Sequence, residues 1–336
     1  MSEPPSRVRI GVVGYGFGRF HVRTLANMSD AHLVAVADQD RTDELRAAAP
    51  QYGFTPYRSA AEMIQREALE ALSVCVPPKC RREILAAGVA AGVAMFVEKP
   101  WASNAAHARQ LADVCRPSRK PVMAGFSFRF HPALVKLRAL LDGELGRPRM
   151  LNGQYLFGWL PPADHWLWDP GNGNGFLNEN SCHLFDAVCG LMGRPVRVFA
   201  EGGNFCGRPA EEAASITLRF ENGSLAALTC GGIGVGAFSE YPRIELITEH
   251  GQAQLTGRSH VWEELRWARR DDGEVRCLSA PPEQLGATRY THAFELFFHC
   301  IREGSAPPAT IDEAVLSVDV AMAVIASARS GRPVDL

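Results

Sequence analysis

Hydrophobic residues in the first third of the chain form short runs, and each run ends at glycine, proline or a charged residue. The runs lie at residues 8–13, 32–37, 71–76, 93–97 and 120–125. Helical patterns separate them, such as 59–65 capped by Ser59 and 81–91 closed by Gly92. Unbroken apolar runs are typical of strands buried on both faces of a parallel sheet. This alternation predicts right-handed βαβ units in a doubly wound Rossmann sheet.

After Gly193 the pattern changes to apolar and polar alternation, which predicts strands with one buried face. Asn222-Gly223, between two alternating runs, is a strong signal for a hairpin. Six strands are predicted, at 196–201, 214–221, 224–230, 243–248, 252–255 and 261–268. Helices are expected at 291–303 and 311–327. The chain therefore predicts a Rossmann domain over 1–124 and an α+β domain with a large, mostly antiparallel sheet over 125–336.

Composition narrows the class of protein. The 336 residues are 46% hydrophobic and 21% charged, so a large core can be buried. The net charge is −2 without a basic run, which gives no sign of nucleic acid or of an anionic membrane as partner. The polar start and the lack of a long apolar run predict a cytoplasmic protein. Nine scattered cysteines without a Cys-x-x-Cys pair predict neither disulfides nor a structural metal site.

A glycine-rich turn stands between the first strand and the first helix. It reads Gly14-Tyr15-Gly16-Phe17-Gly18, and such a turn lets the backbone and a helix amino terminus approach a pyrophosphate. The next strand ends at Asp38, 24 positions after Gly14, where a carboxylate can bind a ribose hydroxyl. Together these features predict a dinucleotide site.

Two details of this site leave the choice of dinucleotide open. A third glycine is usual at position 19, where this chain has Arg19, and Gly18 can take over the helix packing. Asp38 favours NAD because a carboxylate repels a 2′-phosphate. Arg41 lies near enough in sequence to bind that phosphate, so NADP stays an alternative.

The segment Glu98-Lys99-Pro100 directly follows the buried run at 93–97. Ligands of open α/β sheets bind outside the carboxyl ends of the strands, so these charges are expected at a crevice. Pro100 restricts Lys99 to extended geometry and ends the strand. Lys99 is thus a candidate catalytic residue on a stiff element, and the alternative is an ordinary solvated strand end.

The segment from Tyr155 to Asp169 is dense in aromatic residues and holds two prolines. Aromatic faces can stack on the apolar C–H faces of sugar rings and cyclitols. Tyr155 and Trp166 are therefore candidates for substrate binding. The alternative is an aromatic loop that covers a core.

One helix is expected over 176–191, and it places Glu179, His183 and Asp186 on one face at spacing i, i+4 and i+7. Carboxylates beside a histidine can fix its tautomer and raise its basicity, which suits general acid–base chemistry on an alcohol. A surface ion cluster and a metal site are the alternatives. No second histidine cluster completes a metal shell in the sequence.

In these motifs the chain resembles the Gfo/Idh/MocA oxidoreductases, the glucose–fructose oxidoreductase and inositol dehydrogenase family. The resemblance rests on Gly14-x-Gly16, Asp38, Pro77-Pro78, Glu98-Lys99-Pro100, the segment 126–132, Gly143-Glu144-Leu145-Gly146 and Glu179-x-x-x-His183-x-x-Asp186. It implies that Lys99 contacts substrate and nicotinamide and that the Lys99–Pro100 bond is cis. It also implies a homodimer or homotetramer formed through the second sheet.

The chain departs from the family pattern at two further positions. Arg81 stands where a histidine commonly follows the proline pair, which weakens a cofactor role for that position. Glu179 stands where the helix motif usually has aspartate, so the carboxylate is kept but reaches one methylene further.

These features predict a reversible NAD(P)-linked oxidation of a secondary alcohol on a sugar, a sugar derivative or a cyclitol. His183 takes the hydroxyl proton, oriented by Glu179 and Asp186, and Lys99 stabilises the developing charge on oxygen. The reverse roles of Lys99 and His183 fit nearly as well. Further contacts are expected from Pro77 and Glu98 to the cofactor, and from Trp101, Arg129, Tyr155, Trp166 and Asp186 to the substrate.

Two other functions stay open. One is a hydrolase or lyase that oxidises its sugar transiently and retains NAD. The other is a non-enzymatic sensor that binds nucleotide and a partner protein.

Overall fold

The computed structural model describes residues 7–238, 242–258, 261–279 and 282–336, which form two compact units. The first unit takes in the chain up to Ala102 together with Ala106–Gly125 and Tyr290–Val315. The second takes in Ser103–Ala105, Phe126–Arg289 and Leu316–Leu336. The segment 290–315, which the sequence-based division places with the second domain, thus packs with the first unit.

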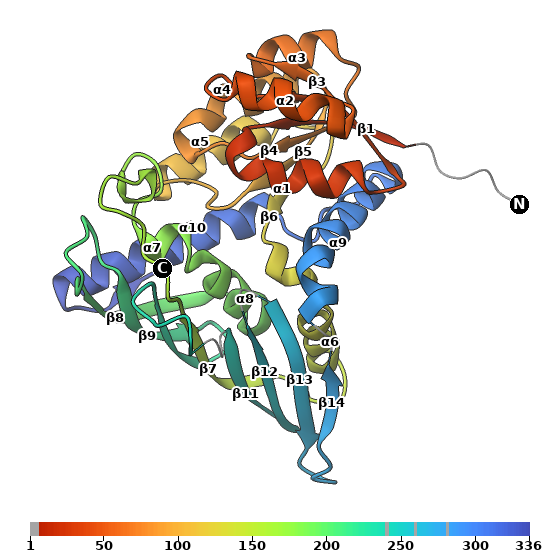
Figure 1. The fold of residues 1–336 in the computed structure, drawn as a ribbon. Helices are drawn as coiled ribbons and strands as arrows, with labels where there is room; N and C mark the ends of the chain where they lie inside the picture. Colours follow the sequence, from red (N-terminus) through yellow and green to blue (C-terminus); the bar gives the residue numbers. More distant parts are fainter. Residues whose placement is uncertain (1–6, 239–241, 259–260, 280–281) are drawn as a thin grey trace, which may run out of the picture. The chain divides into compact units, whose positions relative to one another are not determined.

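The first unit contains a parallel sheet of six described strands in the order β3-β2-β1-β4-β5-β6 (Figure 1). Its elements are β1 (Val8–Val13), α1 (Tyr15–Ala26), β2 (Ala31–Ala37), α2 (Thr42–Tyr52), β3 (Thr55–Tyr57), α3 (Ala60–Arg66), β4 (Ala71–Val74), η1 (Pro78–Cys80), α4 (Arg81–Ala90), β5 (Ala94–Glu98), α5 (Ala105–Cys115) and β6 (Val122–Gly125). This strand order is that of a doubly wound Rossmann sheet, so the predicted fold class is confirmed.

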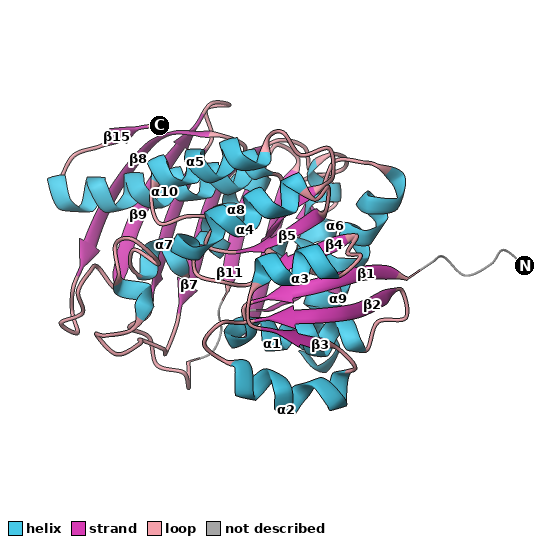
Figure 2. Cartoon of the chain, turned by 90° about the horizontal axis from the view of Figure 1, so that it is seen from above, coloured by secondary structure: helices cyan, strands magenta, loops and turns pink. Residues whose placement is uncertain are grey.

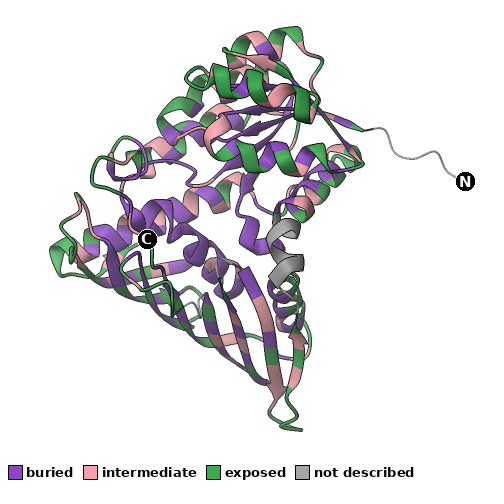
Figure 3. Ribbon diagram, in the orientation of Figure 1, coloured by how far each residue is buried: buried purple, intermediate pink, exposed green. Residues whose placement is uncertain are grey.

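Helices cover both faces of this sheet. Gly11 and Val12 are neighbours on β1 and therefore point to opposite faces. Met63 of α3 lies against Gly11, and Gly18 of α1 lies against Val12. The strands between these layers are buried along most of their length (Figure 3). This burial explains their unbroken apolar sequences.

The second unit contains a sheet of nine described strands in the order β14-β13-β12-β11-β7-β10-β9-β8-β15. Figure 2 shows the β15-β8-β9 edge of this sheet. The strands are β7 (Pro148–Leu156), β8 (Pro195–Gly203), β9 (Ala213–Phe220), β10 (Leu225–Gly231), β11 (Arg243–Thr248), β12 (Gly251–Arg258), β13 (Val261–Arg269), β14 (Arg276–Ser279) and β15 (Val334–Asp335). Only the β7–β10 pair among these described strands is parallel. The predicted antiparallel sheet is confirmed.

Helices pack on one face of this sheet. They are η2 (Ser127–Phe130), α6 (Pro132–Leu141), η3 (Trp166–Trp168), α7 (Phe176–Glu179), α8 (Cys182–Met192) and α10 (Ile311–Ser330), while α9 (Pro282–Glu303) passes into the first unit. Gly153 of β7 lies against Leu184 of α8, and Ser327 of α10 accepts a hydrogen bond from Ala200 N of β8 at 2.9 Å. No helix in the described part of the chain is long and apolar enough to cross a membrane.

The prediction of one helix over 176–191 is wrong, because α7 ends at Glu179 and α8 begins at Cys182. Ser181 N donates to Phe176 O at 3.2 Å, five residues back, and Leu184 N donates to Ser181 O at 3.0 Å, three residues back. Asn180 and Ser181 are weak helix formers whose side chains compete for backbone hydrogen bonds. Glu179 and His183 therefore belong to two consecutive helices.

Candidate functional site

The strand order reverses between β1 and β4, and ligands of doubly wound sheets bind at such a switch point. Gly14 follows β1 there with a φ of 90°, a conformation that side chains rarely adopt. A Cβ on Gly14 would lie 2.9 Å from the Cys75 carbonyl carbon and 2.9 Å from Val76 Cγ1. Glycine is therefore required where the two strand ends meet.

The two other glycines of the turn have different roles. Gly16 lies in the first turn of α1, and Gly18 is buried on the inner side of the same helix. A Cβ on Gly18 would lie 3.0 Å from Val12 Cγ1, so this residue allows α1 to pack closely on β1. This is the packing role expected of Gly18, while Arg19 points outward and is exposed.

Asp38 directly follows β2, and three backbone N–H groups fix its carboxylate. Tyr15 N donates to Oδ2 at 2.7 Å, and Asp40 N and Arg41 N donate to Oδ1 at 2.9 and 3.0 Å. One residue of the glycine turn is thus tied to the end of the neighbouring strand. A crowded glycine turn next to a fixed acid fits the pyrophosphate and ribose of a dinucleotide.

Two other predicted cofactor contacts lie at the same edge of the sheet. Phe17 is 38% exposed on α1, and its ring packs against Phe20 and Tyr290 at centroid distances of 5.4 and 6.2 Å. Pro77 stands just before η1, after the end of β4. Both positions are compatible with a nucleotide bound at the switch point.

Glu98 ends β5, and its side chain is buried at 4% exposure. Its Oε2 accepts a hydrogen bond from Lys99 N at 3.1 Å, and its Oε1 lies 3.1 Å from Nε2 of the fully buried His21. The Lys99–Pro100 peptide bond is cis, as the resemblance implies. A carboxylate on the sheet thus fixes the backbone that carries Lys99.

His21 was given no role from the sequence, although it follows Gly18 by three residues on α1. Its Nδ1 lies 2.8 Å from Ser73 Oγ, within hydrogen-bond distance, and 3.4 Å from Cys75 Sγ. Burial opposes a charge on the ring, but the Cys75 sulfur and the Glu98 carboxylate more than offset it and raise the pKa of His21 to about 10. His21 and Glu98 therefore form a buried ion pair at neutral pH.

Arg81 fixes the backbone on the other side of Lys99, at Pro100 and Trp101. It is 1% exposed, and its Nε donates to Val76 O at 3.0 Å while Nη1 donates to Trp101 O at 3.0 Å and to Pro100 O. Trp101 is also buried, and its indole N–H donates to Ala108 O at 3.1 Å. This environment favours a packing role for Trp101, and its contact with substrate stays a prediction.

In the second unit, His183 lies near the start of α8 and is 8% exposed. The ring of Phe128 stacks on its imidazole with a centroid distance of 4.5 Å and an interplanar angle of 16°. The sequence offers no signal for a role of Phe128 apart from its place directly before the candidate Arg129. The stacked ring fixes the plane of the imidazole.

Arg129 and Asp186 form a buried two-pronged ion pair next to His183. Arg129 Nε donates to Asp186 Oδ2 at 2.8 Å, and Nη2 donates to Oδ1 at 2.6 Å, with both side chains almost fully buried. The pair ties η2 to α8. Glu179 lies at the end of α7 and is 7% exposed, so it is separated from Asp186 by the helix break.

The two aromatic candidates differ in exposure. Tyr155 is fully buried in the core, against Phe128 and Phe157 at centroid distances of 5.7 and 4.4 Å. Trp166 is 36% exposed beside the ring of His165 at 5.5 Å. Trp166 is therefore the better placed of the two for a ligand.

Within the described residues, no group of three or more His, Cys, Asp or Glu side chains could hold a metal ion.

A doubly wound sheet with a crowded glycine turn and a fixed acid defines a dinucleotide-binding protein, here with an added α+β unit. Residues 8–126 match the model of an oxidoreductase family with an NAD-binding Rossmann fold, and residues 134–254 match the GFO/IDH/MocA C-terminal domain. The chain belongs to the Gfo/Idh/MocA family of oxidoreductases, as its sequence motifs predicted, and it is an NAD-binding enzyme.

Two relatives align with this chain over nearly its whole length. D-apiose dehydrogenase of Paraburkholderia graminis is 27% identical over 98% of this chain and 90% of its own. Inositol 2-dehydrogenase of Rhizobium meliloti is 25% identical over 98% of this chain and 99% of its own. The structure of levoglucosan dehydrogenase in complex with NADH and L-sorbose superposes with a TM-score of 0.86 at 20% identity, covering 98% and 99% of the two chains, which shows a common fold.

His21→Gln should remove the buried cation and destabilise the first unit in a pH-dependent way. The pKa of His21 is raised from 6.5 to about 10 on folding, so its contribution is complete below about pH 6.5 and is lost as pH rises through about 10. Urea denaturation followed by circular dichroism should show the largest difference between wild type and variant at pH 6 and the smallest at pH 10. A difference that does not change with pH would contradict a charged His21.

Arg129→Met should destabilise the second unit by about 3–5 kcal/mol, because it leaves the buried Asp186 carboxylate without its guanidinium. The combined Arg129→Met and Asp186→Leu variant should recover most of this loss, since it removes both charges. Tryptophan fluorescence can follow the transition, because every tryptophan except Trp101 lies in the second unit. A double variant as unstable as Arg129→Met would argue against an unpaired charge as the cause.

Proposed function

We propose that the protein is a dehydrogenase that interconverts a secondary alcohol and a ketone on a sugar, a sugar derivative or a cyclitol. The placement of Lys99 is the observation that carries the proposal. Gly14, Cys75 and Lys99 follow three neighbouring parallel strands, β1, β4 and β5. Adjacent strands lie about 4.8 Å apart, so Lys99 stands roughly 10 Å along the sheet edge from the glycine turn. A dinucleotide whose pyrophosphate lies at that turn can bring its nicotinamide toward Lys99.

The chain's own residues supply the proton chemistry. A nicotinamide held near Lys99 would supply the hydride acceptor for the carbon that carries the hydroxyl group. In our proposal His183 takes the hydroxyl proton, and the Lys99 ammonium stabilises negative charge on the same oxygen. The exchange of these two roles is the alternative assignment. Phe128 and the Arg129–Asp186 pair support the His183 role, because they restrict the ring and the helix that carries it.

The substrate class rests on the relatives and on the exposed aromatic surface. The relatives' names give D-apiose and an inositol as substrates. Trp166 offers a partly exposed indole face next to His165, and such faces stack on the apolar side of sugar rings. We propose that Trp166 contacts the substrate in this protein and that Glu179 serves the catalysis by His183.

Lys99→Ala should lower kcat for alcohol oxidation by about 10³-fold or more, while the dissociation constant of NAD⁺ changes less than about threefold. The reason is that the ammonium acts on the reacting oxygen and the nucleotide is held at the glycine turn. NADH absorbance over a panel of sugars and cyclitols measures turnover, and calorimetry measures NAD⁺ binding.

Lys120→Ala is the matched control, because Lys120 is an exposed lysine of the same unit. It should leave both values near those of wild type. Equal loss of turnover and NAD⁺ binding in Lys99→Ala would assign Lys99 to cofactor binding instead. Substrate conversion without net NADH would indicate the hydrolase or lyase that retains its cofactor.

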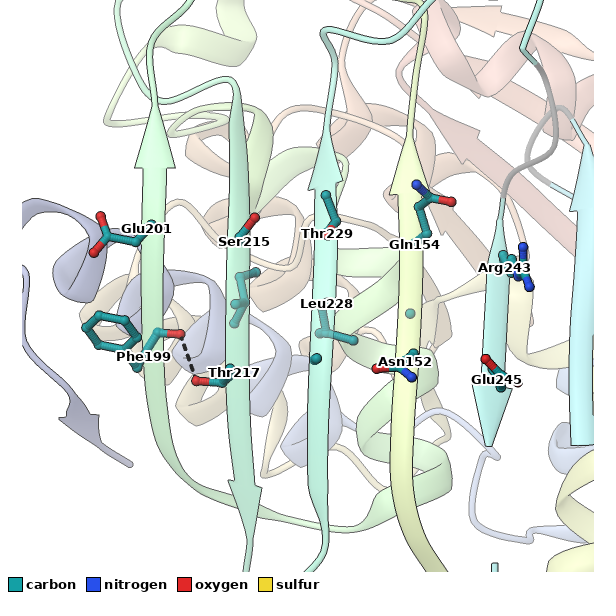
Figure 4. Close-up of a pocket in the computed structure, with 13 residues that line it drawn as sticks. Asn152, Gln154, Phe199, Glu201, Ser215, Thr217, Leu228, Thr229, Arg243 and Glu245 are labelled. Atoms are coloured by element: carbon teal, nitrogen blue, oxygen red, sulfur yellow. Dashed lines mark hydrogen bonds between the residues drawn. The ribbon is translucent and has the colours of Figure 1, made fainter. Parts of the chain in front are cut away.

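We also propose that two copies pair through the outer face of the nine-stranded sheet. This face carries a hollow of about 500 Å³ over β8, β9, β10, β7 and β11 (Figure 4). The strand registers place exposed residues in one row across it, in the order Glu201, Ser215, Thr229, Gln154 and Arg243. The acid Glu201 lies on β8 at one end of the row, and the base Arg243 lies on β11 at the other end. Both strands are two positions away from β10, which is the centre of the row.

A twofold axis parallel to β10 would place β11 of one copy over β8 of the other. Glu201 then faces Arg243 of the second copy twice, so the row is complementary to itself. Glu201→Arg and Arg243→Glu should each dissociate the oligomer, and the combined variant should restore it. Size-exclusion chromatography with light scattering measures the mass. A monomeric wild type at micromolar concentration, or a combined variant that stays dissociated, would contradict this arrangement.

A further inference from the structure

The structure holds a cation close to the ribose-binding acid. Arg41 is the N-cap residue of α2, and its backbone N–H donates to Asp38 Oδ1 at 3.0 Å. Its side chain turns toward the glycine turn, because the point where a Cβ of Gly16 would stand is 3.6 Å from Arg41 Nε. A guanidinium in this place could bind the 2′-phosphate that distinguishes NADP from NAD.

Glu44 forms an ion pair with this guanidinium. Arg41 Nη1 donates to Glu44 Oε1 at 2.7 Å, three residues further along the same chain, and the two side chains are 45% and 51% exposed. An exposed pair of this kind adds little to stability. Its consequence is electrostatic, since a carboxylate now neutralises the cation that a 2′-phosphate would need.

The acidic side chains of this loop also oppose a phosphate. Asp38 cannot turn away, because its two oxygens accept three backbone hydrogen bonds. Residues 38–46 contain four acidic and two basic side chains, and the second base, Arg46, pairs with Asp43 at 3.3 Å. A phosphate would bring a charge of nearly −2 into this acidic loop.

We propose that Glu44 is a specificity-determining residue that holds Arg41 away from a 2′-phosphate and thereby selects NAD over NADP. Asp38 repels the phosphate directly, and Glu44 withdraws the guanidinium of Arg41 that could compensate. This inference rests on NAD binding by the first unit and not on the proposed substrate or on the roles of Lys99 and His183.

The test is calorimetric titration of the full chain with NAD⁺ and with NADP⁺, in the absence of any sugar. Wild type should bind NAD⁺ at least tenfold more tightly than NADP⁺. Glu44→Ala should bind NADP⁺ about tenfold more tightly than wild type does, because a freed guanidinium can form a charge-assisted bond to phosphate. Its NAD⁺ affinity should stay within about twofold.

Two further variants separate the ion pair from overall charge. Asp43→Ala removes one negative charge from the same helical turn but leaves Arg41 paired, so NADP⁺ binding should stay within about twofold of wild type. Adding Arg41→Ala to Glu44→Ala should cancel the gain in NADP⁺ affinity. Both results would assign the effect to Arg41 and its partner.

Several outcomes would overturn the proposal. A wild type that binds NADP⁺ as tightly as NAD⁺, or that binds neither, would show that Glu44 does not select NAD over NADP. An equal gain in Asp43→Ala would assign the effect to net charge alone. A gain that survives the loss of Arg41, or no gain at all in Glu44→Ala, would exclude the guanidinium as the phosphate partner. None of these results depends on whether the enzyme oxidises a sugar.

Discussion

The ion pair between His21 and Glu98 is the interaction on which the first unit's arrangement depends. It joins α1, the helix that begins at the glycine turn, to the end of β5, where Lys99 follows. Both side chains are buried, so each charge would be costly without the other. Aromatic rings of Phe96, Tyr290 and Phe294 surround the imidazole and keep water away. The pair therefore couples the position of the nucleotide turn to that of the candidate catalytic lysine.

Small residues make this coupling geometrically possible. A Cβ on Gly125 of β6 would lie 3.1 Å from Glu98 Oε1, so a larger residue there would push the carboxylate away from His21. Gly18 lets α1 approach β1, and this approach brings His21 within reach of β4 and β5. The glycines thus act on the site through close packing as well as through backbone conformation at Gly14.

The features predicted from sequence are those whose signals are local. Apolar runs, the glycine turn and the Asn222-Gly223 hairpin gave both sheets, because burial and turn geometry act over a few residues. Strand β7 was missed, because glycine occupies its inward position 153 and weakens the apolar alternation. Spacing also placed Asp186 beside His183, whereas its carboxylate binds Arg129, which lies 57 positions earlier. Contacts between distant segments leave no periodic trace in the sequence.

The arginine at position 81 shows how a changed motif residue can keep a site in place. A histidine there would offer at most two ring donors, whereas the guanidinium offers five in a fixed plane. Arg81 uses them on carbonyl oxygens of Val76, Pro100 and Trp101, which join the end of β4 to the segment after β5. Lys99 is therefore held between two buried cations that bind its neighbours on either side. Arginine at this position therefore fixes the backbone around the site through three carbonyl oxygens.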